Sequence, residues 1–179
     1  MNFCSHCGAK VVFRPSKGYE LSRYACDSCH RIYYQSPRLV AGCIAEWSDK
    51  ILLCRRAVEP AFDMWTLPAG FIEAEETAEK GARREILEEA GSKVELGRLF
   101  AVFNVPAFHQ LHVRFLARLI ALDFKAGPET AEVRLFGEYE IPWEKLAFTT
   151  TRETLKYYFA DRKNGSFGFH FSDVVSFLP

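Results

Sequence analysis

The chain has 179 residues, with 23 lysine and arginine side chains against 23 aspartate and glutamate side chains, so its formal net charge at pH 7 is zero. This balance gives no electrostatic support for binding to nucleic acid or to an anionic membrane, and no apolar run approaches the roughly 20 residues of a membrane span. The content of hydrophobic residues, 49%, is enough for one domain of ordinary size and a small module. The first residues lack a basic region followed by an apolar one, so we expect a cytoplasmic protein, or an organellar one if a transit peptide has been removed.

The first predicted element is a small zinc ribbon. Two Cys-x2-Cys pairs are formed by Cys4, Cys7, Cys26 and Cys29. Four thiolates at this spacing fill the tetrahedral shell of Zn²⁺, which indicates a structural rather than a catalytic ion. Disulfides are the alternative, but they would need an oxidising compartment, for which nothing else in the sequence argues. We therefore predict a ribbon over residues 1–34 that depends on Zn²⁺ for its stability, followed by a second domain over residues 35–179.

Apolar runs after the ribbon predict the strands and the last helix of the second domain. The strands are expected at Leu39–Trp47, Ile51–Arg55, Val94–Val105, Leu111–Leu122 and Val133–Phe136. Helical spacing is found over Thr150–Asp161, and the alternating residues 167–171 predict a short last strand. Together with the helix described next, this order predicts an α+β fold or a mixed α/β sandwich.

The stretch between Gly70 and Gly91 predicts a helix with an acidic face. Thr77 is a suitable N-cap and Gly91 a suitable left-handed C-cap, and small apolar residues recur every four positions to form a narrow stripe that can lie on a sheet. Glu85, Glu88 and Glu89 stand at i, i+3 and i+4, so their carboxylates share one face. Such hard oxygen ligands suit Mg²⁺ or Mn²⁺. A charged surface helix with i,i+4 pairs is the alternative.

The same stretch resembles the Nudix box, in which glycine, glutamate and arginine fall at fixed intervals. The matching residues are Gly70, Glu76, Arg84, Glu85, Ile86, Glu88, Glu89 and Gly91, and the one departure is Ser92, at a packing position that is usually aliphatic. The resemblance implies an α/β/α Nudix sandwich that cleaves nucleoside diphosphates linked to another moiety.

The resemblance also implies roles for individual residues. Glu85, Glu88 and Glu89 are expected to bind the catalytic Mg²⁺ or Mn²⁺, with the carbonyl of Gly70 completing the shell. We expect Arg84 to pair with Glu76 and to hold the loop against the helix.

A glutamate on a later loop serves some Nudix enzymes as an extra ligand or as the general base. Here Glu129 matches this position best and Glu132 is second; exposed loop acids are the alternative for both. We assign no role to His109 and His112.

Longer stretches narrow the expected substrate. FCSHCG, YYQSPRLVAGCIAEW, WTLPAGFIE, GPETAEVRLF and IPWEKLAF resemble zinc-ribbon FAD and ADP-ribose pyrophosphatases, including the plant chloroplast type. This resemblance implies hydrolysis of either nucleotide with release of AMP. Aromatic side chains would stack on the bases, and the selected candidates are Phe62, Trp65 and Phe108, with Glu132 as a polar contact; a place in the core is the alternative for each aromatic residue.

Other functions remain open at this point. An NADH or NAD-capped RNA pyrophosphatase shares the chemistry, although the SQPWPFPxS signature of NADH pyrophosphatases is absent. A nucleotide-sensing regulator that binds nucleic acid is the second alternative, but the basic residues of the ribbon are scattered rather than clustered. We expect the ribbon to serve as a structural cap or as the contact of a homodimer.

Overall fold

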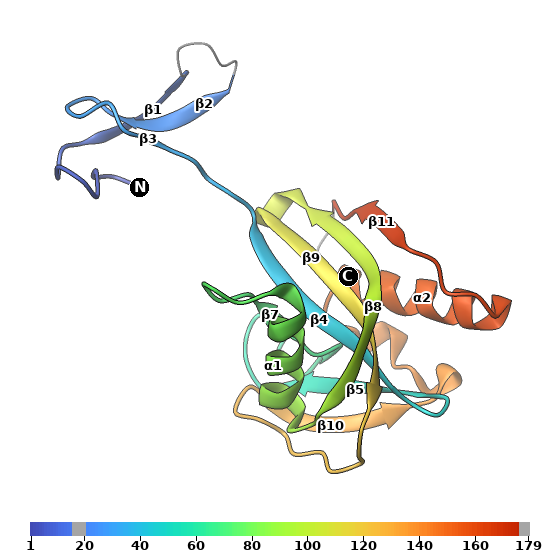
Figure 1. Cartoon of the computed structure of the whole chain (residues 1–179). Coiled ribbons are helices and arrows are strands. Elements are labelled where there is room, and N and C mark those ends of the chain that lie inside the picture. The colour runs from blue at the N-terminus through green and yellow to red at the C-terminus, as the bar shows by residue number, and fades with distance from the viewer. Residues whose placement is uncertain (16–20, 176–179) are drawn as a thin grey trace. The chain divides into compact units, whose positions relative to one another are not determined.

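The computed structural model describes residues 1–15 and 21–175, and the chain divides into two compact units, Met1–Ser36 and Pro37–Pro179 (Figure 1). In the described part of the first unit, a three-stranded antiparallel sheet is formed by β1 (Val11–Pro15), β2 (Ser22–Cys26) and β3 (Ile32–Tyr33). Its buried core consists of Cys4, Val11 and Cys26. A core of this size leaves the unit dependent on something other than apolar burial.

The second unit is built on one mixed sheet. In spatial order its strands are β10 (Thr130–Phe136), β5 (Lys50–Arg56), β4 (Arg38–Trp47), β9 (Gln110–Leu119), β8 (Val94–Val105) and β11 (His170–Asp173). β4 runs parallel to β9, and β11 runs parallel to β8, whereas the remaining pairs are antiparallel.

The sheet opens where β4 and β5 separate. In the described residues, these strands pair directly at Glu46–Ile51 and Trp47–Lys50, next to their turn. Beyond that point β6 (Trp65–Thr66) pairs with β5, and β7 (Ala69–Phe71) pairs with β4. The opening brings the end of β5, β7 and the start of β4 around the space in which the cavities described below lie.

Two helices cover the two faces of the sheet (Figure 1). α1 (Ala78–Ala90) buries its small-residue stripe against one face, where Ala41, Cys43 and Ala45 of β4 point toward it. α2 (Thr149–Asn164) packs Leu155, Tyr158 and Phe159 on the other face, together with Ile44 of the same strand. Alternate residues of β4 therefore enter two different cores, and the predicted α/β/α sandwich is confirmed.

The remaining described elements are short 3₁₀ turns. They are η1 (Pro106–Phe108), η2 (Glu138–Glu140) and η3 (Trp143–Lys145). No helix in the described ranges combines the length and the apolar character that crossing a membrane requires.

The predicted elements agree closely with the observed ones. The strand expected at Val94–Val105 has those bounds, and α2 extends the expected helix by a few residues at its ends. The last strand begins at His170, so it overlaps only the end of the segment 167–171 that the sequence indicated. The start of the stretch that resembles the Nudix box, around Gly70, forms the short strand β7. The sequence pattern did not predict that β7 pairs with β4.

Candidate active site

Four thiols of the first unit form a cluster suited to zinc. The Sγ atoms of Cys4, Cys7, Cys26 and Cys29 all lie within 4.8 Å of one another, and none of the four is in a disulfide. The Tyr33 hydroxyl donates a hydrogen bond of 3.0 Å to the Cys4 Sγ, which is the main reason that the pKa of this thiol falls to about 5. Four thiol sulfurs this close together form the donor set that the structural Zn²⁺ predicted from the sequence requires.

α1 has the caps that the sequence predicts. The Thr77 side chain accepts a hydrogen bond of 3.3 Å from the Lys80 backbone N–H, and Gly91 ends the helix at φ 63°. Gly81 lets the helix approach the preceding loop, since a Cβ there would lie 3.2 Å from the Glu76 Oε2. The caps and this close packing fix which face of α1 carries the glutamates.

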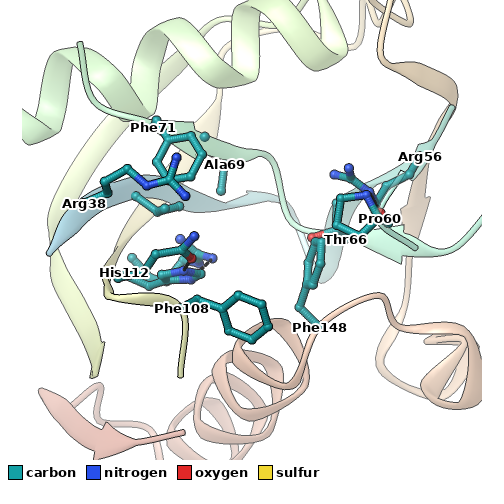
Figure 2. Close-up of a pocket in the computed structure, with 13 residues that line it drawn as sticks. Arg38, Arg56, Pro60, Thr66, Ala69, Phe71, Phe108, His112 and Phe148 are labelled. Atoms are coloured by element: carbon teal, nitrogen blue, oxygen red, sulfur yellow. Dashed lines mark hydrogen bonds between the residues drawn. The ribbon is translucent and has the colours of Figure 1, made fainter. Parts of the chain in front are cut away.

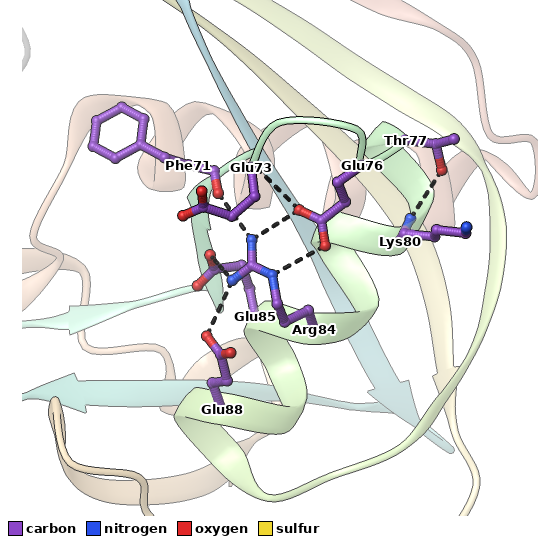
Figure 3. Close-up of polar contacts among 8 residues, drawn as sticks. All are labelled: Phe71, Glu73, Glu76, Thr77, Lys80, Arg84, Glu85 and Glu88. Atoms are coloured by element: carbon purple, nitrogen blue, oxygen red, sulfur yellow. Dashed lines mark hydrogen bonds and ion pairs between the residues drawn. The ribbon is translucent and has the colours of Figure 1, made fainter.

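Arg84 is the centre of the polar network on that face (Figure 3). Its Nε and Nη2 donate to the two carboxylate oxygens of Glu76, each at 3.0 Å, and Nη2 also donates to the Phe71 carbonyl at 2.9 Å. These contacts join the helix to the loop and to β7, as the sequence interpretation of Arg84 expects.

The same guanidinium also pairs with two of the expected metal ligands. Its Nη1 lies 2.7 Å from the Glu85 Oε1 and 3.0 Å from the Glu88 Oε2. Among the described residues, the four cysteines are grouped closely enough to hold a metal ion. The glutamates of α1 are not grouped in this way. Arg84 therefore supplies the positive charge that the acidic face needs, which the sequence interpretation did not assign to it.

Glu89 is the most deeply buried carboxylate of the cluster. Burial, followed by the charge of Glu85, raises its pKa to about 8, although Arg56 and a backbone hydrogen bond from Ala69 oppose the shift. Its Oε2 is buried without a hydrogen-bond partner among the described residues. A buried acceptor without a donor is costly, so this oxygen fits a divalent cation or a proton.

Gly70 brings the backbone of β7 against the helix. A Cβ at this position would lie 2.3 Å from the Glu85 carboxylate, so any larger residue would displace that side chain. The glycine of the motif therefore lets the Glu85 carboxylate lie directly against β7.

A later loop completes the acidic cavity. A Cβ at Gly127 would lie 1.8 Å from the Glu88 carbonyl oxygen, and the Gly127 N–H donates to the Glu89 carbonyl at 3.1 Å. This contact brings Glu129 to the rim of a cavity of about 720 Å³, which Gly70, Glu85, Glu88 and Glu89 also line.

A second cavity of about 350 Å³ lies on the other side of β7 (Figure 2). Aromatic and cationic side chains line it, and Arg56, Pro60, Ala69, Gly70 and Phe71 line both cavities. The two spaces are therefore adjacent, one bounded by carboxylates and the other by guanidinium groups and phenyl rings.

The residues selected from the sequence as substrate contacts are placed differently from one another. Phe108 lines the second cavity, whereas Phe62 is exposed and lines neither cavity. Trp65 is buried in the core and packs edge to face with Phe136, with 4.8 Å between the ring centroids. The Glu132 Oε2 lies 3.0 Å from the Arg55 Nη2.

Several residues of the second cavity were not selected from the sequence. They are Arg38, Arg56, Gln110, His112, Arg114 and Phe148. A signal was present for Arg114, because an arginine between Val113 and Phe115 in an apolar strand is unusual unless it is paired or functional. The others gave no such signal, since they come from β4, β5, β9 and the residue before α2 and meet only in the folded unit.

Comparison with known proteins finds a matching family for each of the two units. The family described as NUDIX domain matches residues 36–165, and the one described as Nudix N-terminal, a zinc ribbon, matches residues 2–35. A crystal structure of a NUDIX hydrolase from Nitrosomonas europaea is 48% identical, covers 97% of this chain and 99% of its own, and superposes with a TM-score of 0.94.

Two curated relatives carry names that specify an activity. An ADP-ribose pyrophosphatase of Methanocaldococcus jannaschii is 34% identical over 119 residues, which are 64% of this chain and 69% of the relative. A NAD-capped RNA hydrolase NudC of Deinococcus radiodurans is 32% identical over 160 residues, or 86% of this chain. The chain spans about half the length of that relative, 55%.

Proposed function

The chain belongs to the Nudix family of hydrolases, and we propose that it cleaves the pyrophosphate bond of ADP-ribose or FAD, releasing AMP, in a reaction that depends on Mg²⁺ or Mn²⁺. The observation that carries this proposal is the pair of adjacent cavities, one acidic and one cationic and aromatic, that share the wall formed by Arg56 and β7. A dinucleotide has the matching parts, because its charged pyrophosphate needs metal and its ring systems need flat apolar contacts.

The metal would be held by Glu85, Glu88 and Glu89, with the Gly70 carbonyl. The hard oxygen ligands, and above all the buried Glu89 Oε2, which has no hydrogen-bond partner among the described residues, support this assignment. When bound there, divalent cations neutralise the phosphate oxygens and acidify a coordinated water.

The residues around these ligands have separate tasks in the proposed reaction. Arg84 holds Glu76 and the Phe71 carbonyl and so fixes β7 relative to α1. Arg56, which lines both cavities, is placed to contact a phosphate that passes from one to the other. Glu129, carried on the loop that Gly127 packs against α1, is the proposed general base.

ADP-ribose and FAD are proposed because of the motifs shared with zinc-ribbon pyrophosphatases and because a 34% identical relative is named an ADP-ribose pyrophosphatase. NAD-capped RNA is the substrate named for the NudC relatives. The same active site would serve it, so it belongs in the same assay.

The test is release of AMP from FAD, ADP-ribose, NADH and NAD-capped RNA by the full zinc-loaded chain, with and without added Mg²⁺ or Mn²⁺. We expect metal-dependent turnover that is fastest with FAD or ADP-ribose. Equal rates without divalent metal would contradict the metal assignment, and preference for capped RNA would reassign the substrate.

A further inference from the structure

The second cavity has a lining that presents hydrogen-bond donors and flat rings. Among the described residues that line it are three arginines, Arg38, Arg56 and Arg114, and no aspartate or glutamate. The guanidinium of Arg38 lies 4.2 Å from the ring centroid of Phe71, and that of Arg56 lies 5.2 Å from the ring centroid of Phe148. These cation–π pairs hold both rings as walls of the cavity, as Figure 2 shows.

One side of the cavity is formed by a chain of three polar residues on β9. Gln110, His112 and Arg114 alternate along the strand and so point to the same face of the sheet. The Arg114 Nη2 lies 3.4 Å from the His112 Nδ1, and the His112 Nε2 lies 2.8 Å from the Gln110 Oε1. His112 and Arg114 are buried, so these contacts are made away from bulk water.

The chemistry of arginine fixes the direction of this chain. A guanidinium can only donate, so the His112 Nδ1 must accept and the ring proton must be on Nε2. Burial, together with the charge of Arg114, lowers the pKa of His112 to about 3, so the imidazole is neutral. Its Nε2–H then donates to the Gln110 Oε1, and the Gln110 amide N–H₂ is left to donate to a molecule in the cavity.

We propose that Gln110 is a specificity-determining residue that selects a ring with a carbonyl-bearing edge, the dioxopyrimidine edge found in flavin and in uracil, over the amino-bearing edge of adenine. Two carbonyl oxygens at that edge accept from the Gln110 amide and from the guanidinium groups of the cavity, whereas adenine offers a ring-nitrogen acceptor beside an amino donor, for which the described lining residues supply no carboxylate. Arg114 and His112 are positioning residues, because they act by fixing the orientation of Gln110.

The inference rests on the proposed function, since it assumes that the second cavity receives the ring system of the nucleotide substrate. Within that function it favours FAD over ADP-ribose, with the flavin in the second cavity. A site whose polar groups are paired by one ligand and left unpaired by another discriminates strongly between the two.

The test measures binding to the zinc-loaded full chain without added Mg²⁺ or Mn²⁺, so that it does not depend on hydrolysis. FMN is followed by its fluorescence, and UMP and AMP by competition against it. We expect FMN, UMP or both to bind at least fivefold more tightly than AMP. Tighter binding of FMN than of UMP assigns the flavin, and the reverse order assigns uracil.

Variants of the polar chain test the mechanism of selection. Gln110→Met should weaken the binding of FMN and UMP by about 2- to 12-fold, the value of one hydrogen bond between neutral groups, and change AMP by less than twofold. Arg114→Met should reduce the ratio of FMN to AMP affinity, while Arg114→Lys, which retains a donor for His112, should preserve it. Arg118→Met, on the same strand but at an exposed position, is the control and should change none of these values.

Two results would overturn the inference. One is AMP binding as tightly as FMN and UMP; the other is a Gln110→Met protein that weakens all three equally. If Gln110→Met does not fold, Gln110→Glu is used instead, because it also removes the amide donor and should oppose the carbonyl edge more strongly. A protein that shows the base preference but no metal-dependent hydrolysis would keep this inference and contradict the proposed function.

Discussion

The residues expected to bind metal relate differently to the fold in the two units. In the ribbon, the four thiols lie within 4.8 Å of one another, and Cys4 and Cys26 are themselves two of the three buried core residues. In the second unit, the glutamates of α1 are spread along a helix that is already held between a sheet and its caps, and Arg84 pairs with two of them. The comparison indicates that the ribbon should depend on metal for its fold, whereas the second unit has a core of its own and is expected to need metal for activity.

The strongest test of this comparison removes one charge from the second unit. Glu89→Gln should lower kcat for AMP release by at least two orders of magnitude while the thermal midpoint stays within a few degrees, because the neutral amide fits the buried position but binds divalent metal poorly. Steady-state kinetics and calorimetry on the same samples measure the two effects.

The matched control for this substitution is Glu79→Gln, which makes the same change at an exposed residue in the first turn of the same helix. It should retain near-normal turnover. Retained activity in Glu89→Gln would show that this carboxylate does not hold the catalytic metal.

The corresponding test on the ribbon removes its zinc. Chelation of the full chain should expose residues 1–36 to limited proteolysis while residues 37–175 stay protected, because the ribbon has too little apolar core to fold without metal. Mass spectrometry of the fragments locates the cuts. If residues 1–36 stayed resistant to the protease after zinc removal, the ribbon would not depend on metal for its fold.

Arg84 contributes both to the fold of the second unit and to the candidate site. Arg84→Gln should lower the free energy of unfolding by about 1–3 kcal/mol, because Glu76 and Glu85 would lose a partly buried cationic partner, and should lower kcat by roughly tenfold. Denaturant titration and kinetics report the two values.

Arg118→Gln breaks an exposed pair with Glu95 and is the control for Arg84→Gln. It should cost less than about 1 kcal/mol. Equal losses of stability in the two variants would indicate that the network of Arg84 has no special role in the fold.

A pH dependence of the stability is expected from Glu89, and it is gradual because it is spread over several pH units. Its folded-state pKa is raised to about 8 from an ordinary value of 4.5, so its contribution to stability is fully present below about pH 4.5 and is lost as the pH rises toward 8. Without Mg²⁺ or Mn²⁺ the slope should be of order 1 kcal/mol per pH unit at most in this window. Chemical denaturation at several pH values measures it.

Glu89→Gln removes the titrating group and should flatten this slope. Added Mn²⁺ should also reduce it, because a bound cation favours the ionised carboxylate. A slope that persists unchanged in Glu89→Gln would assign the pH dependence to another group.

Local patterns predicted the elements of this protein well. Thr77 and Gly91 cap α1 because a hydroxyl acceptor and a residue that tolerates positive φ are needed at those ends whatever the surroundings. The cysteine spacing indicated the thiol cluster for a similar reason, since two short knuckles bring their own ligands together. The assignments of Glu85, Glu88, Glu89 and Glu129 to catalysis stay predictions, because no metal or substrate contact is present to test them.

Contacts between distant segments were harder to predict. The opening between β4 and β5, which β6 and β7 fill, depends on strand pairing over long sequence separations and left no local pattern. For this reason Trp65, selected as a stacking residue, proved to be a core residue of the unit, while Phe148 was not selected although it lines the second cavity.

The sequence by itself determined the family, the acidic helix and the zinc cluster, because their residues are close along the chain and their spacing is set by helix and turn geometry. The tertiary structure alone decided which side chains share a cavity. Arg56 joins the acidic and the aromatic spaces, and Gln110, His112 and Arg114 form one donor chain. Such groupings depend on register and on sheet order, which are determined by the packing of the whole unit.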